Sequence, residues 1–235
     1  MRKLLISILA LSLLAVPTAR AQALPEIDPG YNNYIIPDSD FIGGFDIRAE
    51  DVQAFLEEQG EDCEGDLCLK NYRDEDTGQT AAEIIHKYAH ELALNPYVLL
   101  ITLQKEKSLV TSDGPEEWQY RTAMGYGCPD GADCDSDFFG FYNQVRLGAT
   151  LLRVGYDRAC GDRLSFFKWY VHPHWAKGSL VPIDGRPTYI GNCATASLYN
   201  YTPHRVDGAW IDTDGVYFYG NYNFVILYQR WLEFR

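Results

Sequence analysis

The spacing of apolar residues along the chain predicts a fold made mainly of α-helices. Residues 48–59 place their apolar side chains on one stripe and are followed by Gly60, which is typical of a short amphipathic helix. The other stretches with helical spacing are 80–94, 95–110, 141–154, 194–199 and 221–232. No internal repeat interrupts this order, so the pattern predicts one helical domain.

Two of these helices have start signals in the sequence. Thr80 with Glu83 three residues later forms a capping-box pattern. Asn95 followed by Pro96 predicts an N-cap with proline at the first helical position. The segments expected to form loops are 61–78, 111–140 and 160–192, the last of them irregular or built from short strands.

The N-terminus predicts export. Arg2 and Lys3 precede an apolar run over residues 4–16, and Ala19-Arg20-Ala21 supplies a small-x-small cleavage pattern. We interpret residues 1–21 as a signal peptide; the alternative is an uncleaved N-terminal anchor. The mature protein is then secreted or associated with the cell wall. Residues 22–47, rich in proline and glycine, predict an extended arm before a domain over 48–235.

The charge limits the partners of the chain. Its net charge of −13 argues against nucleic acid and against an anionic membrane surface. We expect a monomer without a cofactor.

Six cysteines in an exported chain predict disulfide bonds. Six cysteines allow 15 connectivities. The pairing that we favour is Cys63–Cys68, Cys128–Cys134 and Cys160–Cys193. A zinc site is the disfavoured alternative, because no CxxC pair occurs.

Glu106 is the residue most indicative of catalysis. On a helical wheel at about 100° per residue, three aliphatic side chains share its face. They are Leu99, Leu103 and Val110. A carboxyl group on an apolar face loses the hydration that favours its charged form, and it then holds a proton for general acid catalysis. The alternative is a buried structural ion pair with a lysine or arginine.

Other reactive side chains give weaker patterns. Asp130, Asp133 and Asp135 could include a second carboxylate or hold Ca²⁺, but the EF-hand spacing is absent and solvated loop acids are the favoured interpretation. His86 and His90 have zinc-binding spacing without the glutamate of a zincin, which favours surface histidines. We therefore expect no metal.

The helix at 95–110 resembles the catalytic helix of soluble lytic transglycosylases and goose-type lysozymes. Leu99-Leu100 and Glu106 take the places of that family's Leu-Leu start and catalytic Glu, although Lys107 separates Glu106 from Ser108. The stretch AMGYG at 123–127 resembles the glycine-containing motif that lines the family's glycan cleft. This resemblance implies a lysozyme-like helical domain, with residues 160–192 as an irregular disulfide-tied insertion.

The sequence also resembles, nearly end to end, a group of secreted actinobacterial proteins called haemagglutinin-like. The matching stretches include LLITLQKEKSLV, AMGYGCPD and ATASLYNYTPH. The two resemblances imply glycan-binding roles, with side-chain packing as the alternative at each position. The residues are Gln104, Tyr126, Gln144, Tyr199, Asn200 and Tyr201.

The lysozyme-like resemblance implies that the chain cuts the β-1,4 link between N-acetylmuramic acid and N-acetylglucosamine, with Glu106 as the acid. A lytic transglycosylase needs only one carboxylate, because the muramyl 6-hydroxyl attacks; a muramidase uses water. The sequence does not separate these two reactions. A non-catalytic adhesin on the same scaffold and a secreted structural protein are the alternatives. For a cleaving enzyme and for an adhesin, the expected partner is peptidoglycan or a related amino-sugar glycan.

Overall fold

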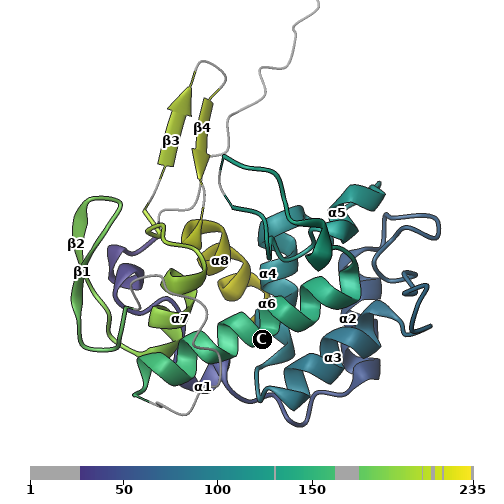
Figure 1. Cartoon of the computed structure of the whole chain (residues 1–235), viewed down its shortest axis with the longest axis horizontal. Helices are drawn as coiled ribbons and strands as arrows, with labels where there is room; N and C mark the ends of the chain where they lie inside the picture. Colours follow the sequence, from purple (N-terminus) through teal and green to yellow (C-terminus); the bar gives the residue numbers. More distant parts are fainter. Residues whose placement is uncertain are drawn as a thin grey trace, which may run out of the picture.

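The computed structural model describes residues 27–129, 131–161, 175–207, 209–212, 215–218 and 220–233. The predicted signal peptide, residues 1–21, lies outside them. The helices are α1 (Asp38–Phe41), α2 (Ala49–Gln59), α3 (Ala81–Glu91), α4 (Pro96–Lys107), α5 (Glu117–Arg121), α6 (Phe141–Ala159), α7 (Cys193–Tyr201) and α8 (Asn221–Tyr228). Shorter helical turns are η1 (Pro29–Asn32), η2 (Ser136–Phe138) and the π-helical η3 (Gln229–Glu233). The mainly α prediction is confirmed (Figure 1).

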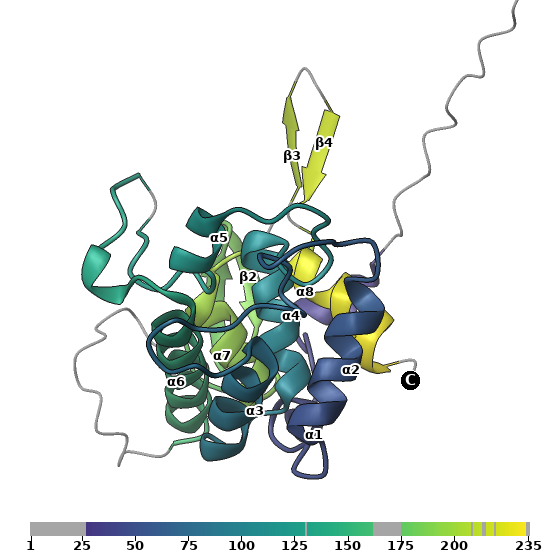
Figure 2. The same ribbon diagram turned by 90° about the vertical axis from the view of Figure 1, so that its right-hand side faces the viewer.

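The strands form two separate antiparallel hairpins. One joins β1 (Leu180–Ile183) to β2 (Arg186–Tyr189), and the other joins β3 (Ala209–Asp212) to β4 (Gly215–Phe218). The first hairpin lies beside α7, and the second projects from the helical body in both side views (Figures 1 and 2). Short strands were one of the two predictions for residues 160–192, which contain β1 and β2, whereas β3 and β4 were not predicted.

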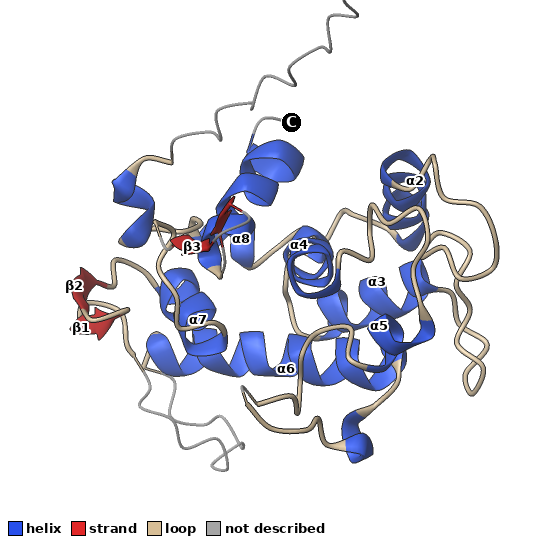
Figure 3. Cartoon of the chain, turned by 90° about the horizontal axis from the view of Figure 1, so that it is seen from above, coloured by secondary structure: helices blue, strands red, loops and turns tan. Residues whose placement is uncertain are grey.

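Helix α4 is the centre of the core. Seen from above, it is surrounded by α3, α6, α7 and α8 (Figure 3). Every residue from Val98 to Leu103 is buried, including Thr102, whose hydroxyl donates to the Val98 carbonyl. A helix that is apolar on all sides must be enclosed by other elements, which explains its position. Asn95 caps its start by accepting from the Tyr97 amide, as predicted.

The N-terminal arm is part of the core, which corrects the prediction of an extended segment. Within residues 27–47 the chain forms η1 and α1, and Ile35, Ile36 and Phe41 are fully buried. The Ile35 amide donates to the Thr195 hydroxyl on α7 at 2.8 Å. Burial of apolar side chains against α7 therefore outweighs the loop-like composition of this segment.

Other departures are local. The predicted loop at 111–140 contains α5 and η2, and α6 continues five residues beyond Val154 to Ala159. Close packing of α6 on α7 supports this extension: a Cβ at Gly155 would lie 3.0 Å from the Ser197 Oγ. The Ser197 hydroxyl also donates to the Leu152 carbonyl.

All six cysteines pair as the sequence analysis favoured. The bonds are Cys63–Cys68, Cys128–Cys134 and Cys160–Cys193. The third bond spans 33 residues and links the end of α6 to the start of α7. It therefore holds the two helices that carry one side of the candidate site.

We expect the double substitution Cys160→Ala with Cys193→Ala to lower the free energy of unfolding by about 4 kcal/mol, because a long loop is released in the unfolded chain. The matched control removes Cys63–Cys68, which spans 5 residues, and should cost about 2 kcal/mol. Urea unfolding followed by fluorescence measures both. A larger loss from the short-loop pair would contradict the loop-length argument.

Candidate active site

Glu106 lies on the last turn of α4 and lines a cavity of about 740 Å³. The helix ends at Lys107, because Ser108 adopts the left-handed conformation with φ 55°. Leu99 and Leu103 are buried as predicted, but Val110 lies beyond the helix, so its predicted place on the same helical face is wrong. The Glu106 side chain is 25% exposed. The carboxylate therefore faces a cavity rather than the core.

Three segments form this cavity. They are the end of α4, the turn at 124–129, and residues 199–204 at the end of α7 and just after it; Trp175 also lines the cavity. An adjoining cavity of about 410 Å³ continues along apolar residues of α6. The two cavities share Gly125, Cys128, Pro129, Asn200 and Tyr201. Together the two cavities make a recess next to Glu106 with a polar end and an apolar end.

Lys105 is the ionic partner of Glu106. Its Nζ lies 2.6 Å from the Glu106 Oε1 and donates to the Thr202 hydroxyl at 2.6 Å. The Lys105 side chain is only 6% exposed and its Nζ lies 5.5 Å from the centre of the Tyr201 ring. The ion pair that the sequence analysis left open as an alternative is thus present, beside a cavity that a purely structural pair does not need.

Tyr201 and Gly125 shape the surroundings of the carboxylate. The Tyr201 hydroxyl donates to the Met124 carbonyl, and burial together with the charge of Glu106 raises the pKa of Tyr201 well above its usual value. Its phenol therefore stays neutral. Gly125 has φ +71°, and a Cβ there would lie 3.3 Å from the Glu106 Oε2. The positive φ favours glycine here, and a Cβ would crowd the carboxylate.

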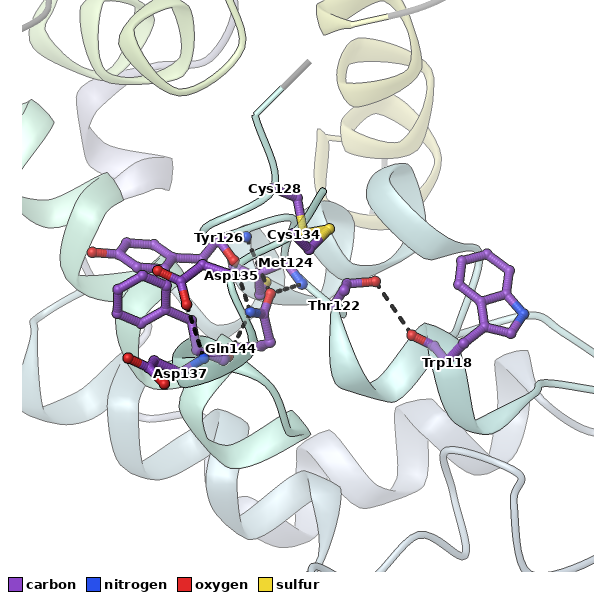
Figure 4. The surroundings of a disulfide bond; sticks show 10 residues. Trp118, Thr122, Met124, Tyr126, Cys128, Cys134, Asp135, Asp137 and Gln144 are labelled. Carbon is purple, nitrogen blue, oxygen red and sulfur yellow. Dashed lines mark hydrogen bonds between the residues drawn. A yellow bond between two sulfur atoms is a disulfide. The ribbon is translucent and has the colours of Figure 1, made fainter. Parts of the chain in front are cut away.

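Gln144 holds the wall of the site from inside α6. The residue is fully buried, and its Oε1 accepts from the Met124 and Tyr126 amides at 3.1 Å each. Its Nε2 donates to the Tyr126 carbonyl at 2.9 Å and the Phe138 carbonyl at 2.8 Å (Figure 4). We predicted a glycan-binding role, but these four bonds are all to backbone, so Gln144 acts on the site by fixing the turn.

The aromatic residues divide between cavity and core. Tyr126 lines the adjoining cavity and packs edge-on against Phe138 at 5.1 Å between ring centres. Tyr201 lines both cavities. Tyr199 borders the larger one but is fully buried, and its hydroxyl donates to the Asn32 carbonyl.

The two predicted amide side chains have backbone partners. Asn200 lines both cavities, and its amide group pairs with the backbone N and O of Trp175. Gln104 lines neither cavity. It bonds to the Val110 and Thr111 amides and to the Thr111 hydroxyl, which closes the turn after α4.

The remaining candidates among the described residues line neither cavity. Asp133 and Asp135 are exposed, and Asp130 lies outside the described residues. His86 and His90 lie on α3 with ring centres 5.9 Å apart. Among the described residues, no group of three or more His, Cys, Asp or Glu side chains is placed to hold a metal ion.

Sequence reasoning missed Lys105, Thr202, His204 and Asp184. Lys105 is adjacent to Glu106 in sequence, but the helical wheel places the two side chains on different faces of the helix. His204 lines the larger cavity, and its Nδ1 lies 2.8 Å from the Asp184 Oδ1. The Asp184-Gly185 pair directly after the apolar run at 180–183 is a hairpin signal that could have located the β1–β2 turn.

A family model described as "LasA, N-terminal domain" matches residues 34–160, more than half of the chain. The chain belongs to the LasA N-terminal domain family. No match was found among curated proteins or among solved structures. The matching family is neither the lysozyme-like nor the haemagglutinin-like one that the sequence resembles.

The LasA N-terminal domain match covers α1 to α6 and therefore Glu106, Gly125 and Gln144. Tyr201 and His204 lie beyond it. Membership agrees with the predicted export of the chain, as do the three disulfides. Within the described ranges, no helix is long and apolar enough to cross a membrane.

Proposed function

We propose that this chain acts on bacterial peptidoglycan and cleaves its β-1,4 glycosidic bonds, with Glu106 as the general acid. One observation carries the proposal. Glu106 is the single carboxyl group among the described residues that line the two joined cavities. A carboxyl group at the wall of a recess is the group that protonates a leaving glycosidic oxygen.

The surroundings of Glu106 suit a sugar substrate. Tyr126 and Tyr201 offer aromatic surface with polar tips, and Leu147, Leu151 and Val154 extend an apolar surface from them. Asn200 adds an amide at the junction of the two cavities. A recess that is mostly apolar with few polar groups is typical of ligand sites.

Family membership supports the same target. The LasA N-terminal domain indicates a secreted protein active on peptidoglycan, and the lysozyme-like resemblance of residues 95–110 and 123–127 adds the bond that is cut. Family membership thus supports peptidoglycan as the substrate, and Glu106 supports cleavage of its glycosidic bonds as the reaction.

A second candidate function is glycan binding without cleavage. The ion pair between Lys105 and Glu106, at 2.6 Å, favours it, because this contact gives Glu106 a structural role that needs no proton transfer. The recess would then bind the glycan through Tyr126, Tyr201 and Asn200.

Digestion of purified peptidoglycan, with the products read by mass spectrometry, tests the proposal. We expect release of muropeptides with either reducing or 1,6-anhydro ends. Tight binding without any release would overturn cleavage and select the second candidate.

A further inference from the structure

The larger cavity holds a second group that can transfer a proton. His204 lines it together with Glu106, and the two residues come from different segments, the loop after α7 and the end of α4. The His204 Nδ1 lies 2.8 Å from the Asp184 Oδ1, and the side chains are 37% and 21% exposed. An imidazole whose Nδ1 donates to a carboxylate carries its lone pair on Nε2, as a general base requires.

The β1–β2 hairpin places Asp184 against His204. Ile183 and Arg186 pair across a two-residue turn, in which Asp184 has φ 49° and Gly185 φ 70°. Asp184 also accepts from the Arg205 amide at 2.8 Å through its second oxygen. Both carboxylate oxygens are thus directed at the chain segment that carries His204.

Further contacts hold the hairpin and that segment together. The Arg186 guanidinium donates to both carboxylate oxygens of Asp207, at 2.9 and 3.0 Å. Arg205 bonds to the same carboxylate and to the Thr188 hydroxyl on β2. Bidentate arginine–carboxylate pairs fix geometry as well as contributing energy.

The backbone under His204 is fixed by the start of α8. The buried Asn221 donates to the carbonyls of Thr202 and His204 at 2.9 and 2.8 Å. A Cβ at Gly220 would lie 2.5 Å from the His204 Cβ, so that position accepts only glycine. The hairpin therefore holds the imidazole, and α8 holds the backbone that carries it.

We propose that His204, oriented by Asp184, is the base that activates water, and that the enzyme is a hydrolase. This rests on the proposed function of Glu106. In a transglycosylase the acid itself can serve as the base for the muramyl 6-hydroxyl, so a second positioned group is needed only when water attacks.

The bond between C1 and the leaving oxygen breaks, and that oxygen takes the proton of Glu106. Water bonds to C1 and gives a proton to the His204 Nε2. The proton on His204 returns to Glu106 through solvent once the two sugar products have left. Asp184 only positions the imidazole.

The test digests peptidoglycan in ¹⁸O-labelled water with the parent chain, His204→Gln, His204→Ala, Asp184→Asn and the surface control His90→Gln. We expect labelled reducing ends from the parent. His204→Gln should lower kcat by about 10²–10⁴ with little change in KM, and added imidazole should restore part of the activity of His204→Ala. Asp184→Asn alone should lower kcat less than His204→Gln does. Added to His204→Gln, it should lower kcat no further.

The outcomes separate the two proposals. Anhydro ends, or full activity in folded His204→Gln, would overturn the base while leaving Glu106 in place. A parent that releases nothing would overturn the cleavage function and the base with it. Melting curves accompany every variant, and if the His204 variants unfold, an unchanged kcat in folded Asp184→Asn would overturn the proposal.

Discussion

Replacement of Glu106 by Gln is expected to lower peptidoglycan cleavage by about 10²–10⁴, the contribution typical of general acid catalysis. The amide keeps the size of the side chain and can still accept from Lys105, but it has no proton to give. Glycan binding should survive, because the cavity keeps its shape. Product release measured against glycan binding on the same preparation separates the two effects.

Stability should fall moderately in the same variant. The Lys105 ammonium is nearly buried and would lose its opposite charge. Because the Glu106 side chain is 25% exposed, we expect a loss of about 1–3 kcal/mol, below that of a fully buried pair. Combining Lys105→Met with Glu106→Gln removes both charges and should recover part of the stability while the activity stays lost.

The double variant distinguishes catalysis from structure. If the pair were only structural, any activity lost through Glu106→Gln would return as stability returns. The matched control is Glu117→Gln, the same chemical change at an exposed glutamate on α5 that pairs with Arg121. A folded and fully active Glu106→Gln protein would remove the catalytic assignment.

The helices with local start signals are the best predicted part of the fold. Thr80 and Glu83 form the expected reciprocal capping bonds, and Asn95 caps α4 as expected. These signals work because each involves side chains within three residues of the backbone groups that they bond. The end of α4 was harder to predict, because a serine rather than a glycine adopts the left-handed conformation there.

Contacts between distant segments account for the errors. The composition of residues 22–47 predicts an extended arm but not its contacts: the Asn192 side chain donates to the Ile36 carbonyl, 156 residues away in sequence. Nothing local to Ile36 predicts that partner. Burial in the tertiary structure thus determined the conformation of a segment whose prolines and glycines predict an extended chain.

The candidate site shows the same division. Glu106 could be found because its spacing relative to Leu99 and Leu103 is visible in one helix. The Asp184–His204 pair could not, since an Asp-Gly turn predicts a hairpin but not the surface on which it docks. Gln144 was singled out because it lies in GFYNQV at 140–145, another stretch that matches the haemagglutinin-like group, and its hydrogen-bond partners assign it a different role.

Replacement of Gln144 by Leu should destabilise the protein by about 2–5 kcal/mol. Four backbone groups would lose their partner at once, and a buried group left without a hydrogen bond costs about 1–3 kcal/mol. Partial access of water at Tyr126 and Phe138 keeps the total below the sum of four full penalties. Urea unfolding with linear extrapolation measures the loss.

Gln104→Leu is the matched comparison for this prediction. Gln104 also bonds to the backbone after its own helix, through the Val110 and Thr111 amides, but its bonds lie near the surface, where water can replace them. We expect it to cost about 1 kcal/mol. Gln144 holds the turn that carries Gly125 next to Glu106. The Gln144→Leu protein should therefore lose cleavage activity even at temperatures where it is fully folded, whereas Gln104→Leu should keep its activity. Equal stability losses in the two variants would show that burial of Gln144 is not what makes its four bonds necessary.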